Sequence, residues 1–547
     1  MDGTRAMYRS LECFILVLLL FNRVICTMSV SSHWNWKLLL NNTGVVAMHM
    51  AVTHHNNVVI FDQTGAGPSH YRLHRCKTRG SGSSCYAHSV EYDVLKNKVR
   101  ALHLPSDTWC SSGSFLSNGS LLQTGGNGSG ARRIRYYRPC TNSRCDWMEL
   151  KKQLSIRRWY ASSLYLPQEN GVIVVGGQQA FSYEFVPNLG SSEQYNLPFL
   201  RHTYEKKSKG NNLYPFLHLL TDGHLFIFAN RDSILLDYNR SKVVKKFPRM
   251  PGNGGRSYPS TGSSVILPLD YNDNFTKVEV MVCGGAAHGA YGAARRGKYL
   301  RALRSCGRMV ITGEHHRWHM ENMPGPRLMG DMLILPTGNI LIINGAKRGC
   351  AGWNSASYPA LEPYLYRPEH PSGRRFQVLR ATKIARLYHS SAILLPDGRI
   401  LVAGGNPNNR YISHGVAHPT ELRLQALVPD YMSNRLDHLR PENVSVTYPQ
   451  RIDGVALGDT FSVSFWLGAE LGNLTVVVYA PPFTTHSLSM NQRMVRLECL
   501  SSVMGGPGLV AATVVAPPSI YVTPPGYYML TVLNDGIPSR SSWIRIM

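Results

Sequence analysis

A phenol and an imidazole stand side by side in the segment "RLYHSS", as Tyr388 and His389. Neighbouring residues on a regular strand face opposite ways, but a twist where the strand begins can aim both side chains at one metal ion. The segment "RRWYASS" carries Tyr160 at the matching place, and "DTWCSSGSF" carries Cys110 just before another apolar strand. These side chains offer metal ligation and redox chemistry, provided that the fold brings them together.

Cys110 is also the cysteine that is left over when the others are paired. Two of the eleven cysteines, Cys13 and Cys26, lie in a segment expected to be removed, and the nine that remain are an odd number. An exported protein oxidises its cysteines, so we expect local bridges between the close pairs. The expected bridges are Cys76–Cys85, Cys140–Cys145 and Cys283–Cys306, while Cys350 and Cys499 could pair only if the fold brings them together.

The N-terminus predicts export. Basic Arg5 and Arg9 precede the short apolar run "FILVLLLF", and small residues follow, so residues 1–27 are interpreted as a signal peptide. No later segment looks membrane-spanning. Seven N-x-S/T sequons fit an exported chain: Asn41, Asn118, Asn127, Asn239, Asn274, Asn443 and Asn473.

The formal charge of +25 makes nucleic acid the first partner to consider. Export argues against it, and the basic residues are spread along the chain rather than gathered in arms. Acidic cell-wall polysaccharide is the alternative partner, and the charge could equally serve solubility alone.

The elements that must position these residues come from an internal repeat. Each copy has a small polar start, an apolar strand, a tight turn, a second apolar strand and a small-residue stop, as in "SSAILLPDGRILVAGG". Asp-Gly or Asn-Gly between apolar runs is a hairpin signal, because the turn needs positive φ. The seven copies span residues 45–65, 113–126, 161–177, 215–230, 263–285, 328–346 and 390–405.

A repeat of roughly 50 residues with paired strands resembles the kelch repeat. The sequence therefore predicts an all-β chain with a seven-bladed kelch-like propeller over residues 33–433. Strand starts from different blades meet at the axis of such a ring. Tyr160, Tyr258 and Tyr388 share one repeat position, which packing within the repeat could also explain.

Short strands separated by Gly, Pro and Asn follow from residue 440. They predict an immunoglobulin-like β-sandwich over residues 440–547, with a tyrosine corner at Tyr527 or Tyr528.

The segment "EHHRWHME", residues 314–321, looks more metal-like by composition, since it holds His315, His316 and His319. Trp318 and the following "MPGPR" fit the edge of a blade, so we expect an exposed outer strand there. His54 and His55 fall in a hairpin turn and are expected to be solvated.

Four motifs in order, "DTWCSSGSFLSNGSLLQTGG", "RRWYASSLYLP", "ARLYHSSAILLPDGRILVAGG" and "APPFTTHSLSMNQR", resemble the copper radical oxidases. The resemblance is strongest to the plant glyoxal oxidase-like aldehyde oxidases and covers nearly the whole mature chain. It implies a thioether between Cys110 and the ring of Tyr160, which would carry a tyrosyl radical. It also implies one copper ion held by Tyr160, Tyr388, His389 and His486, with His486 supplied by the C-terminal domain and Tyr388 taking the substrate's proton.

The resemblance implies oxidation of aldehydes such as glyoxal to carboxylic acids, with O2 reduced to H2O2 outside the cell, in the wall or apoplast. The partners would be a small aldehyde and O2, with no nucleic acid and no membrane. A primary alcohol or carbohydrate oxidase with the same site, and a non-catalytic kelch binding module, remain alternatives. Galactose oxidase has a tryptophan stacked on the radical where this chain has Gln178 and Gln179, which argues against galactose. Trp109 or Trp159 could shield the radical instead.

Overall fold

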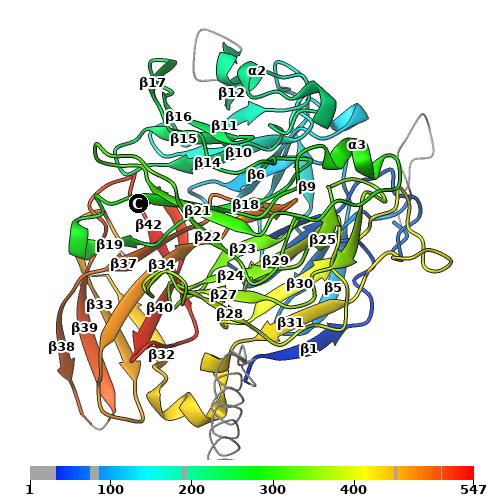
Figure 1. The fold of residues 1–547 in the computed structure, drawn as a ribbon. Coiled ribbons are helices and arrows are strands. Elements are labelled where there is room, and N and C mark those ends of the chain that lie inside the picture. The colour runs from blue at the N-terminus through cyan, green and yellow to red at the C-terminus, as the bar shows by residue number, and fades with distance from the viewer. Residues whose placement is uncertain (1–32, 74–84, 188–193, 449–452, 507) are drawn as a thin grey trace, which may run out of the picture.

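The computed structural model describes residues 33–73, 85–187, 194–448, 453–506 and 508–547, and strands dominate them (Figure 1). The predicted signal peptide, residues 1–27, lies outside the described residues. No helix in the described ranges has both the length and the apolar character needed to cross a bilayer.

Seven groups of four antiparallel strands in meander order lie in the described residues, and each begins with one of the seven predicted hairpins. Six of the groups are separate four-stranded sheets, and the first belongs to a six-stranded sheet. The first three are β2(His49–Val52), β3(Asn57–Phe61), β4(Ser89–Asp93), β5(Lys98–Leu102); β6(Ser112–Phe115), β7(Leu121–Thr124), β8(Ile134–Tyr137), β9(Trp147–Glu149); and β10(Ala161–Leu166), β11(Gly171–Gly176), β12(Ser182–Val186), β13(Tyr195–Asn196). The fourth and fifth are β14(Phe216–Leu219), β15(Leu225–Ala229), β16(Asp232–Asp237), β17(Lys242–Lys246); and β18(Ser263–Ile266), β20(Glu279–Cys283), β21(Ser305–Val310), β22(His319–Asn322). The last two are β23(Asp331–Ile334), β24(Ile340–Ile343), β27(Tyr364–Tyr366), β28(Phe376–Val378); and β29(Ser390–Leu394), β30(Ile400–Gly404), β31(Leu424–Val428), β1(Asn35–Leu40).

The sheets form the ring of a seven-bladed propeller. From β6 to β29 the first strands contact one another in chain order, and β29 contacts β2, which closes the ring through the inserted β35. The N-terminal strand β1 completes the seventh blade by pairing with β31, where Trp36 faces Leu427, so strands from both ends of the ring share one sheet (Figure 1). Inner strands such as β11, "GVIVVG", are buried throughout, because neighbouring blades cover both of their faces.

A buried arginine precedes four of the inner strands and clamps each blade. Arg158 donates to the carbonyl oxygen of Gly176 at 2.8 Å, Arg256 to that of Gly284 at 2.6 Å, and Arg386 to that of Gly404 at 2.9 Å. Each bond ties the start of the first strand to the end of the second, and Arg327 bonds the carbonyl of Asn344 in the same way. Hydrogen bonds to the backbone offset the cost of burying each guanidinium. Each clamp holds in place the backbone that leads to the residue two positions after the arginine. In three of the four blades this residue is a tyrosine.

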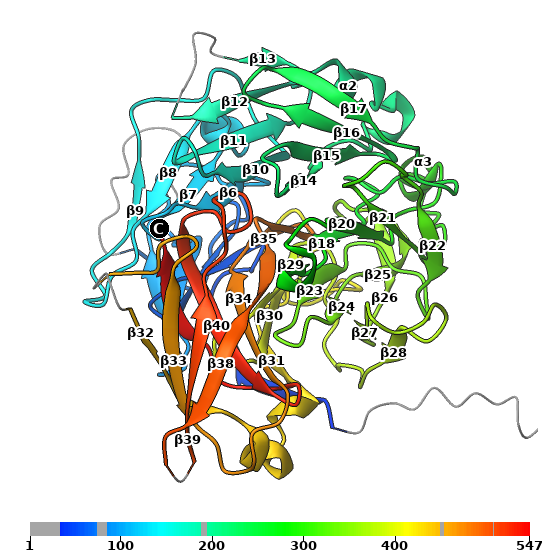
Figure 2. The same cartoon turned by 90° about the vertical axis from the view of Figure 1, so that its left-hand side faces the viewer.

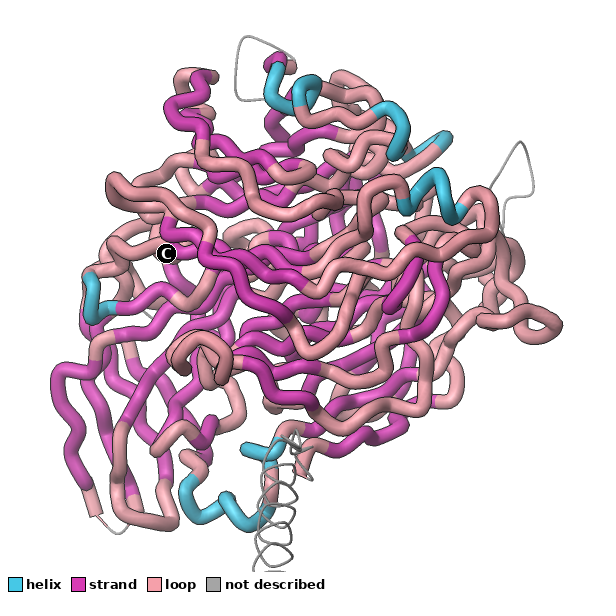
Figure 3. Tube along the Cα trace, viewed as in Figure 1, coloured by secondary structure: helices cyan, strands magenta, loops and turns pink. Residues whose placement is uncertain are grey.

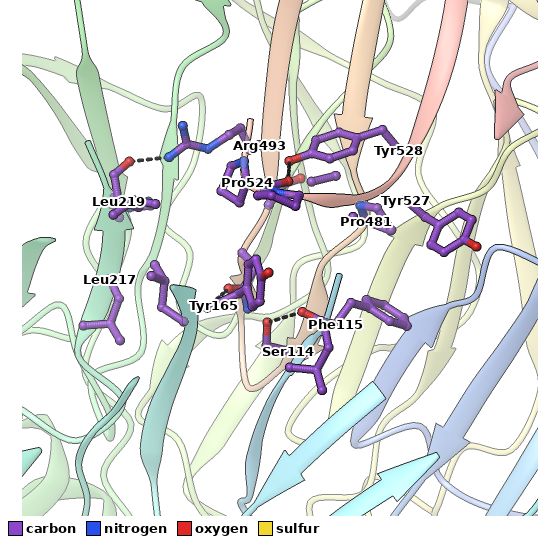
Figure 4. A pocket seen from close by; sticks show the side chains of 18 of the residues that line it. Ser114, Phe115, Tyr165, Leu217, Leu219, Pro481, Arg493, Pro524, Tyr527 and Tyr528 are labelled. Atoms are coloured by element: carbon purple, nitrogen blue, oxygen red, sulfur yellow. Dashed lines mark hydrogen bonds between the residues drawn. The ribbon is translucent and has the colours of Figure 1, made fainter. Parts of the chain in front are cut away.

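The C-terminal part is a sandwich of two sheets. One sheet holds β32(Glu442–Thr447), β33(Thr460–Trp466), β39(Leu509–Val515) and β38(Cys499–Met504), and the other holds β37(Arg493–Leu497), β34(Leu474–Ala480), β40(Gly526–Asn534), β41(Ile537–Pro538) and β42(Ser542–Ile546). The Tyr528 hydroxyl donates to the carbonyl of Pro524 at 2.7 Å, which is the predicted tyrosine corner (Figure 4).

Two strand pairings join the sandwich to the propeller. The short β19(Leu269–Asp270) of the fifth blade pairs in parallel with β37. The hairpin of β35(Phe483–Thr485) and β36(Leu488–Met490) leaves the sandwich and pairs with β2 of the first blade, so that it lies in the middle of the ring, close to β6, β18 and β29 (Figure 2). At the same joint Arg493 donates to the carbonyl of Leu219, beside a cavity of about 70 Å³ (Figure 4).

Helices within the described residues are few and short (Figure 3). They are α2(Pro198–His202), α3(Ala290–Ala294) and the 3₁₀ turns η1(Gly128–Gly130), η2(Lys206–Ser208), η3(Tyr271–Asp273), η4(Asp430–Met432) and η5(Asn434–Leu439). A further hairpin, β25(Ala346–Gly349) and β26(Ala356–Pro359), extends from the sixth blade.

The cysteines pair largely as expected. Disulfides join Cys140 to Cys145 and Cys283 to Cys306. Cys85 is also disulfide-bonded, while Cys76 lies outside the described residues. The fold does not bring Cys350 and Cys499 together: both are free thiols, the first buried in the propeller and the second in β38 of the sandwich.

The histidine-rich segment lies at the edge of the fifth blade, as predicted. The strand β22 is the outermost of its sheet, and His315 and His319 are exposed. His54 differs from the expectation of a solvated turn residue, because its ring stacks on Tyr527 of the sandwich at 4.0 Å.

Candidate metal and redox centre

The five candidate residues meet at the axis of the ring. Tyr160 precedes β10, Tyr388 and His389 precede β29, Cys110 precedes β6, and His486 lies in the turn between β35 and β36. None has more than 4% of its surface exposed. Residues from three blades and the sandwich thus share one enclosed space.

Backbone geometry explains how adjacent residues turn inward together. Cys110, Tyr160, His389 and His486 all adopt left-handed conformations, with φ of +54°, +64°, +64° and +45°. Residues other than glycine rarely do so, and each such position costs of order 1–3 kcal/mol unless its surroundings hold it. Neighbouring residues on a regular strand would face opposite ways, but the left-handed turn at His389 brings both side chains to the same side. The His389 ring stacks on that of Tyr388 with centroids 3.8 Å apart.

Three side chains are close enough to share a metal ion. The ligand atoms of Cys110, His389 and His486 all lie within 4.8 Å of one another, and the Cys110 Sγ is 3.2 Å from His486 Nε2. The Nδ1 of His486 contacts Thr485 Oγ1 at 2.7 Å, which orients the ring so that Nε2 faces the cluster.

His389 provides the strongest sign that a ligand belongs here. Both of its ring nitrogens are buried, and neither has a hydrogen-bond partner in the part of the chain that the structure describes. An unpaired buried polar group is costly, and native proteins avoid it. Imidazoles beside phenols suit a transition metal such as copper, so the residues present fit the ion that the resemblance implies.

Burial controls the charge of these groups. It lowers the pKa of His389 and of His486 well below the usual value, so both imidazoles are neutral, the form that binds metals. Burial, together with the neighbouring thiol and phenols, raises the pKa of Tyr160 and of Tyr388 well above the usual value. The phenols therefore keep their protons unless a cation stabilises their anions.

Tyr258 lies in the same cluster, although the sequence did not assign it to the site. Its hydroxyl donates to the Tyr160 oxygen at 3.1 Å and lies 2.9 Å from the Tyr388 oxygen. A hydroxyl has one proton, so if Tyr258 donates to Tyr160 it accepts from Tyr388. Tyr258 thus links the two phenols, and the shared repeat position was the signal that could have identified it.

Tyr214 closes another side of the centre. Its ring lies 5.1 Å from that of His486, and its hydroxyl donates to the carbonyl of Ser111 at 2.9 Å. The Tyr-Pro pair that Tyr214 begins also occurs at Tyr258, which is a weak sequence signal for it.

Trp159 covers the ring of Tyr160. Their centroids are 4.6 Å apart with an angle of 36° between the planes, and Trp109 packs on Trp159 at 4.8 Å. Gln178 and Gln179 have no aromatic ring with which to cover Tyr160. Trp159, the residue before Tyr160, covers the ring instead.

Comparison with known families divides the chain where the fold changes. Residues 48–431 match the model described as "Glyoxal oxidase N-terminus", and residues 440–546 match "Galactose oxidase-like, Early set domain".

Curated relatives extend over almost the full chain. It is 42% identical over 522 residues to "Aldehyde oxidase GLOX" of Vitis pseudoreticulata, covering 94% of this chain and 97% of that protein. It is 42% identical over 530 residues to "Aldehyde oxidase GLOX1" of Arabidopsis thaliana, covering 94% of this chain and 84% of the relative. A solved structure of a fungal alcohol oxidase of the AA5 family, in complex with copper, has the same fold, with a TM-score of 0.68 at 18% identity over 94% of this chain and 99% of that one.

Replacing either central histidine should remove the metal site. We expect His389→Ala and His486→Ala each to weaken Cu²⁺ binding by at least about 100-fold, more than loss of an outer partner costs. Equilibrium dialysis with metal analysis measures it, with thermal unfolding as a check on folding.

His315→Ala is the matched control, since His315 belongs to the exposed histidine-rich segment. It should bind copper as the unmodified protein does. Loss of binding in this variant, with binding kept in His389→Ala, would place the site at the blade edge instead.

Proposed function

The chain belongs to the glyoxal oxidase family, and we propose that it is a secreted copper enzyme that oxidises aldehydes with O2. The overall reaction is aldehyde plus O2 plus water to carboxylic acid plus H2O2. The observation that carries this proposal is the buried cluster of two neutral imidazoles, linked phenols and a thiol at the propeller axis. A binding module has no need of such a cluster, whose enclosed polar groups are costly without a ligand.

Tyr160, Tyr388, His389 and His486 would hold the copper ion. Bound copper would supply one-electron redox chemistry and a positive charge that stabilises phenolates and polarises the substrate's oxygen. The oxidation of an aldehyde hydrate removes two electrons, so a second one-electron group is needed beside a single ion. Tyr160 is the proposed second group.

Cys110 would make Tyr160 easier to oxidise by a thioether bond to its ring. Formation of the bond removes the thiol hydrogen and one ring hydrogen, and the two electrons and two protons pass to O2, giving H2O2. The two residues are already joined through the backbone, since the Tyr160 N–H donates to the Cys110 carbonyl at 3.0 Å. This bond holds the start of the second blade, which carries the thiol, against the start of the third, which carries the phenol.

Tyr388 would accept the proton of the bound aldehyde hydrate. Its oxygen lies within hydrogen-bond distance of Tyr258, whose hydroxyl continues to Tyr160. Tyr258 would position both phenols by its hydrogen bonds to their oxygens. Trp159 would exclude water from the face of Tyr160.

Glycosylation sites support secretion. Six of the seven sequon asparagines are exposed, and Asn127 is half-buried, so attached glycans can extend into solvent. The peroxide would then be released outside the cell, in the wall or apoplast.

The substrate class follows from turnover measurements. Copper-loaded protein should produce H2O2 and consume O2 in equal amounts with glyoxal or another small aldehyde, and far less with primary alcohols or galactose. Tyr388→Phe should lower kcat by about 10²–10⁴-fold, the usual contribution of a positioned acid or base. His315→Ala should leave kcat unchanged.

An alcohol or sugar that outperforms every aldehyde would select the alcohol or carbohydrate oxidase instead. Absence of peroxide with all substrates, from protein that binds copper, would favour the non-catalytic module.

A basic groove on the propeller supports acidic polysaccharide as a partner. The groove has a volume of about 810 Å³, and its lining includes Arg249, Lys277, Arg308, Arg317 and Arg375 against a single carboxylate, that of Glu279. Glu279 is paired with Arg308 at 2.6 Å, whereas Lys277 and Arg317 form no ion pair with any described residue. Free guanidinium and ammonium groups in one groove suit a chain of carboxylated sugars.

Two cations of the groove should account for this binding. Lys277→Ser/Arg317→Ser should weaken binding to polygalacturonate by about tenfold or more, since each cation near a polyanion contributes about 1 kcal/mol. Affinity chromatography and titration over a series of salt concentrations measure it.

Lys151→Ser/Lys152→Ser removes the same charge from exposed positions outside the groove. It should change the affinity little. Equal weakening in both double variants would mean that net charge alone attracts the polymer.

A further inference from the structure

We propose that Trp159, Trp109 and Trp353 form an electron path between Tyr160 and the protein surface. Through this tryptophan path an external one-electron oxidant would withdraw an electron from Tyr160 without entering the centre. The inference rests on the proposed function, because it gives Tyr160 a redox role.

The rings form a continuous series of close contacts. Trp159 lies 4.6 Å from Tyr160, Trp109 lies 4.8 Å from Trp159, and Trp353 stacks on Trp109 at 4.7 Å with 13° between the planes. Trp353 is 38% exposed. The path crosses three blades, since Trp159 precedes β10, Trp109 precedes β6, and Trp353 lies between β25 and β26.

A path of this kind is needed because the centre itself is enclosed. Tyr160 is 2% exposed and Cys110 is fully buried, so an oxidant too large to enter the centre cannot contact either one. Electron tunnelling falls steeply with distance, and phenols and indoles are the side chains most easily oxidised. Rings in direct contact divide one long transfer into short steps.

The surroundings of the path keep the electron vacancy on Tyr160. The Nε1 atom of Trp109 is buried and has no hydrogen-bond partner among the described residues, so an oxidised Trp109 has no acceptor there for its proton. Without proton loss the indole is readily reduced again. The Lys209 ammonium lies 5.8 Å from the centre of the Trp159 ring and disfavours a positive charge there.

The electron balance is simple. Tyr160, held as a phenolate by copper, loses one electron and becomes a radical, and the oxidant gains that electron. No proton moves and no bond forms. The path would therefore support activation of the centre by an external oxidant, a process separate from turnover with O2 and substrate.

The test measures radical formation directly. Copper-loaded protein in the one-electron-reduced state is mixed with hexachloroiridate(IV) in a stopped-flow spectrometer, and growth of the tyrosyl radical absorption gives the rate. Trp109→Leu and Trp353→Leu should each slow it by about an order of magnitude, the change that about 1.4 kcal/mol of added barrier produces. Trp353→Tyr should restore most of the rate, because a phenol can still be oxidised.

Trp466→Leu is the matched control, as Trp466 is 50% exposed on the sandwich. Its rate should equal that of the unmodified protein. Equal rates in the unmodified protein and both Leu variants would overturn the path while leaving the proposed function intact. If the unmodified protein forms no radical and its Cys110 and Tyr160 stay unlinked, the proposed function itself fails. Mass spectrometry of the same samples separates these outcomes.

Discussion

The candidate centre depends on the entry of one hairpin of the sandwich into the propeller channel. The strand β35 pairs with β2, and the turn that follows it carries His486 to the side of His389, with ring centroids 5.0 Å apart. Phe483 anchors the hairpin in full burial, which contributes about 1.5–3 kcal/mol. The Phe483 ring also explains the glycine at position 113, because a Cβ on Gly113 would lie 2.6 Å from that ring. The propeller and the sandwich therefore both contribute side chains to the candidate centre.

Strain at the centre is balanced by the order of the blades around it. Left-handed conformations at Cys110, Tyr160 and His389 are unfavourable in isolation, and the buried arginine clamps hold two of the strand starts in place. An arginine clamp of the same kind, that of Arg256, precedes Tyr258. The repeat position occupied by Tyr258 therefore also places its hydroxyl within hydrogen-bond distance of Tyr160. In a fold built from repeats, equivalent positions of several blades lie near the same axis. Small sequence differences between the blades then give these side chains different contacts.

The sequence predicts the parts of the molecule that depend on local patterns. Asp-Gly and Asn-Gly turns between apolar runs identify four of the seven hairpins, and the close cysteine spacings identify Cys140–Cys145 and Cys283–Cys306. Contacts between distant residues leave no such pattern. The pairing of β1 with β31, the hydrogen bonds of Tyr258 and the stacking of Trp353 on Trp109 all require the closed ring. The free state of Cys350 and Cys499 likewise follows from their separation in space, which a cysteine count does not encode.

The state of Cys110 after exposure to copper and O2 shows whether Tyr160 becomes part of a redox centre. Peptides from the copper-treated, aerated protein can be analysed by mass spectrometry after reduction and alkylation. We expect one linked pair containing Cys110 and Tyr160, lighter by two hydrogens than the sum of its peptides, and absent from protein kept free of copper. A Cys110 that is alkylated as a free thiol after the same treatment would contradict the account.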